Sequence, residues 1–182
     1  MMTVAPTPRR SELDGLSALV TGGSRGLGLL LAARLARRGC RVTMAARDEE
    51  ELRRGAAWVE QKTGTSVATA VCDVRDRGAV ESAVRRTGDR HGGLDIVVAN
   101  AGVIQVAPVA SLDSGAFEDA MDTIFGGTVN TALAALPRLC LIGSVGGLLA
   151  VPHLLPYSCA KAAVGALGEG RCTHEACTAP AR

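Results

Sequence analysis

A glycine-rich segment at 21–28, which reads Thr-Gly-Gly-Ser-Arg-Gly-Leu-Gly, follows an apolar run at 16–21. It predicts a tight turn between a buried strand and a helix, because glycine adopts backbone conformations that other residues avoid. A helix that begins near Gly26 offers free N–H groups and the positive end of its dipole to an anion. The segment therefore predicts a turn that binds a pyrophosphate. Glycines also serve plain turns, and this spacing differs from the common Gly-x-Gly-x-x-Gly fingerprint.

Short apolar runs alternate with helical patterns along the chain. Strands are expected at 16–21, 41–46, 67–72, 94–99 and 139–143. Helices are expected at 26–38, from 49 onward after an Asp48 cap, and at 76–90, 114–136 and 156–169. This alternation predicts an α/β fold, a doubly wound parallel sheet of about five strands with helices on both faces. The carboxyl ends of the strands then meet at one edge, where such folds bind ligands.

The expected helices carry their own signals. In the first one, the leucines are expected to face the sheet: Leu27, Leu30, Leu31 and Leu35. In the second, glutamates at 49–51 fill the first turn, where negative charge is favourable for the helix dipole. Aromatic residues make up only 2% of the chain, so the core must be built from alanine, valine, leucine and glycine.

Composition narrows the class of protein. A hydrophobic content of 47% excludes global disorder, and a net charge of +2 indicates no preference for nucleic acid or membranes. None of the six cysteines forms a Cys-x-x-Cys pair, so we expect reduced, buried thiols in a cytoplasmic protein and no metal. Cys172, His174 and Cys177 lack an evident fourth metal ligand. No apolar stretch is long enough to span a membrane, and 1–12 is expected to be a disordered leader.

Tyr157 and Lys161 are four residues apart and therefore share one face of the last expected helix. A phenol is a poor base at neutral pH, but a nearby cation favours its ionised form. Tyr157 is therefore predicted to give a proton to a carbonyl oxygen, or to accept one from an alcohol. Tyr-x-x-x-Lys pairs also arise by chance, although this tyrosine is the only one in the chain.

Taken together, the motifs resemble the short-chain dehydrogenase/reductase family. The matching motifs run in the family's order over about 13–170: Leu13-Asp14-Gly15, the glycine-rich turn, Asp73-Val74, Asn100-Ala101-Gly102, and Tyr157 with Lys161. The resemblance implies a Rossmann-type, NADP-binding domain at 13–170, followed by an irregular tail at 171–182. It also implies a small-molecule carbonyl or alcohol substrate and a homodimer.

The resemblance assigns roles residue by residue. Three residues would be catalytic, namely Ser144, which would bind the substrate oxygen, Tyr157 and Lys161. The cofactor would contact Thr21, Gly22, Ser24, Arg25, Gly26, Leu27, Gly28, Arg47, Asp73, Val74, Asn100, Ala101, Gly102, Tyr157 and Lys161. Asp73 would bind the adenine amino group, and Asn100 would support the cofactor end of the fourth strand. Lys161 would also hold the nicotinamide ribose.

The cofactor implied is NADP(H). NAD-binding members of the family place an acid at the end of the second strand, where this chain has Ala46, followed by Arg47 and Asp48. Arg25 lies within the glycine-rich turn, and two guanidinium groups suit a 2′-phosphate. The alternative is that both arginines are ordinary exposed residues and that Asp48 is only a helix cap, which leaves NAD(H) open.

The chain also departs from the family. Ile124 stands where the family has an asparagine, and isoleucine cannot bind the water of a proton relay. The resemblance ends near Gly170 and implies a C-terminally truncated form that lacks the family's last two strands and leaves the fifth strand at a sheet edge. We therefore expect an NADP(H)-dependent oxidoreductase that interconverts a carbonyl and an alcohol by hydride transfer. The alternative is a non-catalytic dinucleotide-binding module, or an inactive fragment of such an enzyme.

Overall fold

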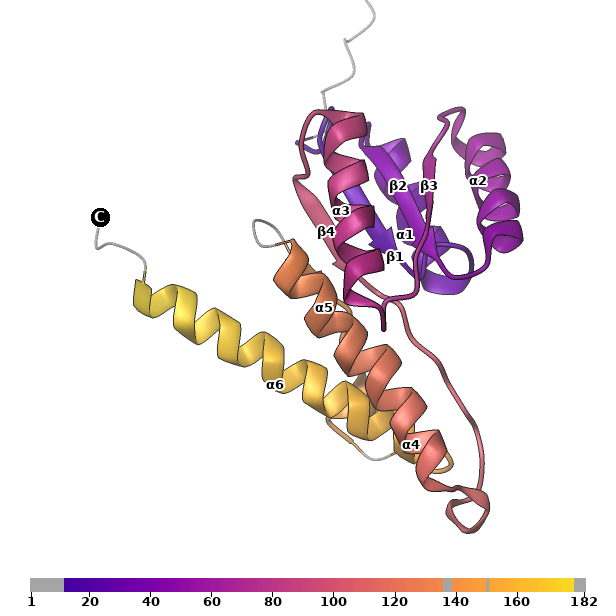
Figure 1. Ribbon diagram of the computed structural model, residues 1–182, viewed down its shortest axis with the longest axis vertical. Helices are drawn as coiled ribbons and strands as arrows, with labels where there is room; N and C mark the ends of the chain where they lie inside the picture. The colour runs from indigo at the N-terminus through magenta and orange to yellow at the C-terminus, as the bar shows by residue number, and fades with distance from the viewer. Residues whose placement is uncertain (1–11, 136–138, 150, 179–182) are drawn as a thin grey trace, which may run out of the picture.

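The computed structural model describes residues 12–135, 139–149 and 151–178. Its five strands form one parallel sheet in the order β3-β2-β1-β4-β5 (Figure 1). The strands are β1 (Ser17–Thr21), β2 (Arg41–Ala46), β3 (Ala68–Val71), β4 (Ile96–Ala99) and β5 (Leu139–Leu141). The predicted doubly wound sheet is confirmed. The order of connection reverses between β1 and β4, so the crevice for a ligand lies at their carboxyl ends.

The first three helices begin within one residue of their predicted positions, whereas the later ones differ from prediction as described below. They are α1 (Gly26–Arg37), α2 (Glu49–Thr63), α3 (Arg77–His91), α4 (Ser114–Ala120), α5 (Gly127–Ala134) and α6 (Leu155–Thr178). Three aspartates cap helices by accepting a backbone N–H three residues on: Asp48, Asp76 and Asp113. Two short 3₁₀ turns, η1 (Val109–Ser111) and η3 (Val145–Gly147), lie in the loops.

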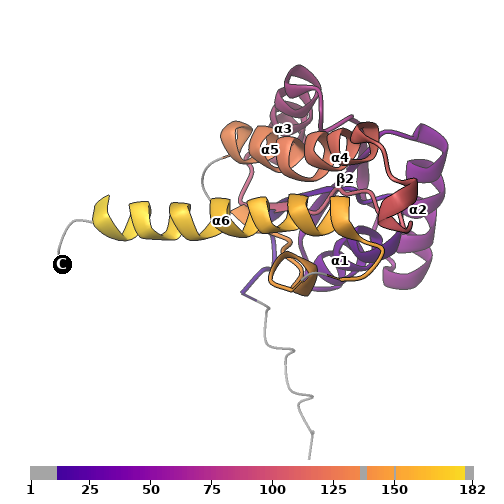
Figure 2. The ribbon, with the colours of Figure 1, turned by 90° about the horizontal axis from the view of Figure 1, so that it is seen from below.

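Helices cover both faces of the sheet, as predicted. Alternate residues of each strand point to opposite faces. On one face, Val20 and Met44 pack with alanines of α1 and with Leu52 of α2. On the other face, Leu19 and Ala70 join a cluster with residues of α3. The first part of α6 packs against α4 and the turn that follows it, and its C-terminal half extends beyond the rest of the molecule (Figure 2).

The face that α1 turns toward the sheet differs from the predicted one. Leu27 and Leu30 are 52% and 57% exposed, so the prediction that they face the sheet is wrong. The buried residues of α1 are all small: Gly28, Ala32, Ala33 and Ala36. Small side chains let the helix axis lie close to the strands. Leu31 and Leu35 are partly buried at the margin of this contact.

The helix expected at 114–136 is interrupted. A π-helical turn, η2 (Met121–Gly126), separates α4 from α5, which ends at Ala134. Ile124 lies in this turn and is fully buried. A π-helical turn inside an α-helix is frequent at functional sites. This turn packs against the first part of α6, which carries Tyr157.

The C-terminal part of the chain also differs from expectation. The helix α6 continues to Thr178, past the expected end at Glu169, so the tail expected to be irregular is helical as far as it is described. β5 has three residues and is shorter than the expected strand, but it does form an edge of the sheet. The expected leader at 1–12 lies outside the described residues, except for Glu12.

The contact between α1 and the glycine-rich turn leaves no room for a methyl group at Gly28. A Cβ there would lie 2.6 Å from Asn100 Nδ2 and would also overlap the Gly22 carbonyl. Gly28→Ala is therefore expected to lower the free energy of unfolding by about 1–3 kcal/mol. Gly88, inside α3, has open space around it. Gly88→Ala should raise the free energy by about 0.5–1 kcal/mol.

Urea unfolding of both variants measures these changes against the wild-type protein. Two alanine variants of equal stability would contradict the close packing of α1 on the turn.

Candidate active site

A cavity of about 700 Å³ opens at the carboxyl ends of the strands, within the size range of small-molecule sites. Most of the expected site residues line it: Gly22, Ser24, Arg25, Gly26, Leu27, Arg47, Asp73, Val74, Asn100, Ala101, Gly102, Tyr157 and Lys161. Three expected residues do not line it, namely Thr21, Gly28 and Ser144. The cavity thus brings the glycine-rich turn and the Tyr157–Lys161 pair together, although they are far apart in the sequence.

Thr21 does not line the cavity but forms hydrogen bonds to residues that do. Its side chain is buried, and its Oγ1 accepts hydrogen bonds from the backbone N–H groups of Asn100 and Ala101, at 3.0 and 3.2 Å. The same hydroxyl lies 3.3 Å from the Val98 carbonyl, to which it donates. Asn100 Nδ2 in turn donates to the carbonyls of Thr21 and Gly22. These bonds join the carboxyl ends of β1 and β4 and so position the turn that lines the cavity.

Two glycines of the glycine-rich turn have a backbone conformation that favours glycine. Gly22 and Gly26 have φ angles of 65° and 56°, in the left-handed region that favours glycine. A Cβ on Gly22 would also lie 2.8 Å from Ala101 Cα. Gly26 begins α1 at the cavity, so the unpaired N–H groups of the first helical turn face the space where an anion would bind.

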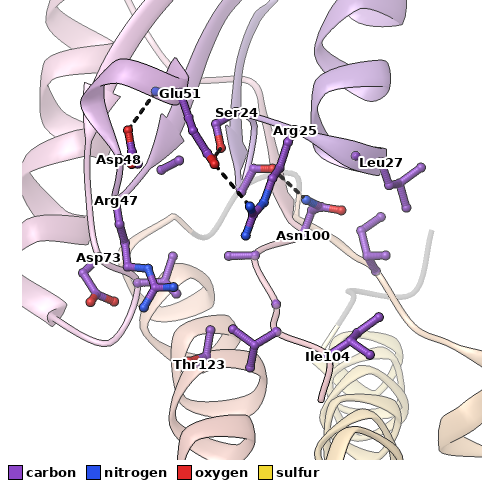
Figure 3. Close-up of a pocket in the computed structure, with 18 of the residues that line it drawn as sticks. Ser24, Arg25, Leu27, Arg47, Asp48, Glu51, Asp73, Asn100, Ile104 and Thr123 are labelled. Atoms are coloured by element: carbon purple, nitrogen blue, oxygen red, sulfur yellow. Dashed lines mark hydrogen bonds and ion pairs between the residues drawn. The ribbon is translucent and has the colours of Figure 1, made fainter. Parts of the chain in front are cut away.

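Charged side chains surround one end of the cavity (Figure 3). The guanidinium groups of Arg25 and Arg47 both point toward the cavity. Arg25 Nη1 pairs with Glu51 Oε1 at 3.2 Å, and Ser24 Oγ donates to Glu51 Oε2 at the same distance. From the sequence, Glu51 is expected only to favour the dipole of α2. One sequence signal could have placed Glu51 at the site. It lies three residues after the Asp48 cap, and a residue at that position points back toward the start of the helix.

Asp73 lies on the rim of the cavity and already has a partner. Arg75 Nη2 contacts its carboxylate at 2.7 Å, and Arg75 also approaches Asp119. The hydrogen bond from Arg75 holds the pKa of Asp73 below its ordinary value. Arg75 was not predicted as a neighbour of the site. The adjacent Cys72 is buried, and burial raises the pKa of its thiol to about 11, so this cysteine stays protonated at neutral pH.

Tyr157 and Lys161, the expected acid/base pair, also line the cavity. Tyr157 is half-buried, whereas Lys161 is only 6% exposed. Lys161 Nζ donates to the Ile142 carbonyl at 2.6 Å and lies 5.8 Å from the centroid of the Tyr157 ring. Burial lowers the pKa of Lys161. The lysine is thus held by the backbone after β5 with its charge over the face of the phenol.

Ser144 is close to Tyr157 but does not line the cavity. Its hydroxyl caps the 3₁₀ turn η3 by accepting the N–H of Gly146 at 3.1 Å. A Cβ on Gly146 would lie 3.3 Å from Tyr157 Cε1 and 3.4 Å from Ser144 Oγ. Because Gly146 has no side chain, only its backbone lies between the side chains of Tyr157 and Ser144.

The π-helical turn η2, which lies beside the cavity, carries no amide side chain. Ile124 is fully buried and does not line the cavity, but its neighbour Thr123 does. The Thr123 hydroxyl is buried without a hydrogen-bond partner among the described residues. Thr123 was not predicted, and no sequence signal distinguishes it from other helical threonines.

No cluster of possible metal ligands occurs in the part of the chain that the structure describes. The side chains of Cys172, His174 and Cys177 lie outside the described residues. Cys40 and Cys72 are buried as expected, but Cys140 and Cys159 are exposed. Within the described ranges, no helix is both long and apolar enough to cross a membrane.

The junction made by Thr21 can be tested by removing one oxygen. In Thr21→Val, the part-buried N–H groups of Asn100 and Ala101 and the buried Val98 carbonyl lose the partner that Thr21 Oγ1 supplies. We expect the free energy of unfolding to fall by at least about 2 kcal/mol. Thr69→Val, at an exposed position of β3, should change it by less than about 0.5 kcal/mol. Denaturant titration measures both, and an equally small effect of the two substitutions would refute the role of Thr21.

Comparison with known proteins agrees with this geometry. The model of the short chain dehydrogenase family matches residues 17–175. Gluconate 5-dehydrogenase of Gluconobacter oxydans is 37% identical over 174 residues, which cover 91% of this chain and 68% of that enzyme.

Two solved structures share the fold. An NAD⁺-bound xylitol dehydrogenase has a TM-score of 0.82 at 28% identity, covering 88% of this chain and 65% of its own. A short-chain type dehydrogenase/reductase from Mycobacterium marinum has a TM-score of 0.83 at 28% identity, covering 90% and 70%. The chain thus spans about two thirds of the length of these relatives. It belongs to the short-chain dehydrogenase family of oxidoreductases.

Proposed function

We propose that the chain is an NADP(H)-dependent oxidoreductase that interconverts a carbonyl and an alcohol of a small molecule. One observation carries this proposal: the glycine-rich turn and the Tyr157–Lys161 pair line the same cavity. When bound, the nicotinamide supplies or accepts the hydride. The residues of the chain hold the cofactor and move the proton that accompanies the hydride.

The residues of the cavity fit a dinucleotide. Gly22 and Gly26 have no side chain between the backbone and a pyrophosphate, and the start of α1 offers N–H groups to it. Asn100 holds the turn in place by bonds to its carbonyls. Ala101 and Gly102 continue the wall toward Tyr157 with small residues, so that an extended ligand can pass.

The preference for NADP(H) rests on the residues after β2. Ala46 ends β2 at the cavity and offers no carboxylate to ribose hydroxyls. Arg25 and Arg47 offer guanidinium groups, which bind phosphate through two parallel hydrogen bonds. NAD(H) is the alternative, because a related structure is of an NAD⁺-bound enzyme.

Tyr157 transfers the proton. Its hydroxyl donates a proton to the substrate oxygen during reduction, and accepts one from the alcohol during oxidation. The ammonium of Lys161 lies over the Tyr157 ring, 5.8 Å from its centroid, and is kept in place by the Ile142 carbonyl. Ser144, on the other side of Gly146, binds the substrate oxygen once its hydroxyl turns away from the Gly146 N–H.

A second function is favoured by a specific observation. Ile124 places a buried hydrocarbon at the position where the family has an asparagine, so the chain offers no amide there to a water that would resupply protons. A cofactor-binding module without turnover fits this substitution. It would retain the adenosine end of the site, which does not involve Ile124.

Replacing Tyr157 separates the two functions. Tyr157→Phe removes only the phenolic oxygen, so turnover should fall by at least about 100-fold while the Kd for NADPH changes by less than about twofold. Turnover is followed through nicotinamide absorbance, with a panel of small ketones and polyols that includes gluconate and xylitol. Calorimetric titration gives the Kd. Cys159→Ala, at an exposed position of the same helix, is the matched control and should retain turnover.

If turnover in Tyr157→Phe were unchanged, a group other than Tyr157 would have to transfer the proton. Tight NADPH binding by the wild-type protein without turnover on any member of the panel would favour the binding module.

A further inference from the structure

The carboxylate of Glu51 occupies the end of the cavity where the two arginines converge. One oxygen pairs with Arg25 and the other accepts a hydrogen bond from Ser24 (Figure 3). The Glu51 side chain is 28% exposed, whereas that of Arg25 is 79% exposed. The carboxylate is thus the more confined member of the pair, and it anchors the arginine rather than the reverse.

The backbone of α2 places Glu51 there. Asp48 caps the helix by accepting the Glu51 N–H at 2.8 Å, which directs the first turn of α2 toward the glycine-rich turn. One helical turn further on, Gly55 faces the same turn, and a Cβ on it would lie 2.8 Å from the Ser24 carbonyl. The missing side chain at Gly55 therefore lets α2 approach closely enough for Glu51 to reach Ser24 and Arg25.

The charged side chains that line this end of the cavity do not add up to a positive net charge, so net charge alone does not favour an anion there. Two arginines, Arg25 and Arg47, face three carboxylates, which are those of Asp48, Glu51 and Asp73. Asp73 is matched by Arg75 outside the cavity lining. In the described part of the chain, Arg25 forms an ion pair within the cavity, with Glu51, whereas Arg47 forms none within 4 Å and interacts with Asp73 only at longer range.

We propose that Glu51 is a specificity-determining residue that weakens the preference of the site for NADPH over NADH. A 2′-phosphate must draw Arg25 away from Glu51 and then lie near a like charge, whereas a ribose hydroxyl meets neither cost. Because the Arg25 side chain is 79% exposed, solvent screens its charge, so the effect is a moderate one that tunes the preference without abolishing it. This inference rests on the proposed function, because it assigns a role within the same cofactor site.

The opposite role is also physically sensible and makes the proposal testable. Glu51 would instead help NADPH if its main effect were to hold Arg25 in a position ready to bind phosphate. Removing the negative charge then weakens NADPH binding, because the arginine loses its orientation. The two roles predict opposite signs for one substitution.

The test is calorimetric titration of Glu51→Gln with NADPH and with NADH. Glutamine keeps the size of the side chain and one acceptor oxygen, but its other terminal group is an uncharged NH2 that donates hydrogen bonds. We expect the Kd for NADPH to fall about three- to tenfold and that for NADH to change less than about twofold. The gain for NADPH should shrink as the salt concentration rises, because the charges involved are exposed.

Two matched variants isolate the cause. Glu50→Gln removes the same charge one residue earlier, from a side chain that pairs with Arg53 and does not line the cavity. It should leave both Kd values within about twofold of the wild-type values. In an Arg25→Gln background, Glu51→Gln should give a smaller gain for NADPH, because the charge that Glu51 compensates is already gone.

An unchanged or weaker affinity of folded Glu51→Gln for NADPH would overturn the inference and leave the proposed function in place. A folded wild-type protein that binds neither NADPH nor NADH would overturn the proposed function, and this inference with it.

Discussion

The site depends on the junction between β1 and β4. Thr21 and Asn100 exchange hydrogen bonds with the backbone of the opposite strand end, so that neither strand can shift without leaving buried polar groups unpaired. Gly28 packs against this junction and brings α1 to it. The glycine-rich turn is thereby held open toward the cavity by residues that mostly do not line it.

The two ends of the cavity use charge differently. At the proposed adenosine end, Arg25 is 79% exposed, so its pairing with Glu51 is screened and can be exchanged for a ligand. At the proposed catalytic end, Lys161 is buried and held over the Tyr157 ring by the Ile142 carbonyl. The proposed function needs both arrangements, because the cofactor must bind and leave while the acid/base group stays in place.

The sequence predicts the features that follow from the periodicity of apolar residues and from the order of the motifs. The five strands, their parallel arrangement and the approach of Tyr157 to the glycine-rich turn follow from alternating apolar runs and from motif order. It does not predict which face of α1 is buried, since leucine periodicity pointed to Leu27 and Leu30 whereas close packing requires Gly28 and the alanines. Glu51 was also missed as a site residue, because its contact with Arg25 depends on how closely α2 packs at Gly55.

The most direct test of this account is calorimetric titration of the folded wild-type protein with NADPH, with NADH as the comparison. The account predicts saturable binding of both, with the lower Kd for NADPH, because the glycine-rich turn, Arg25 and Arg47 face one cavity. Folded protein that binds neither cofactor would contradict it, since the cavity would then not be a dinucleotide site.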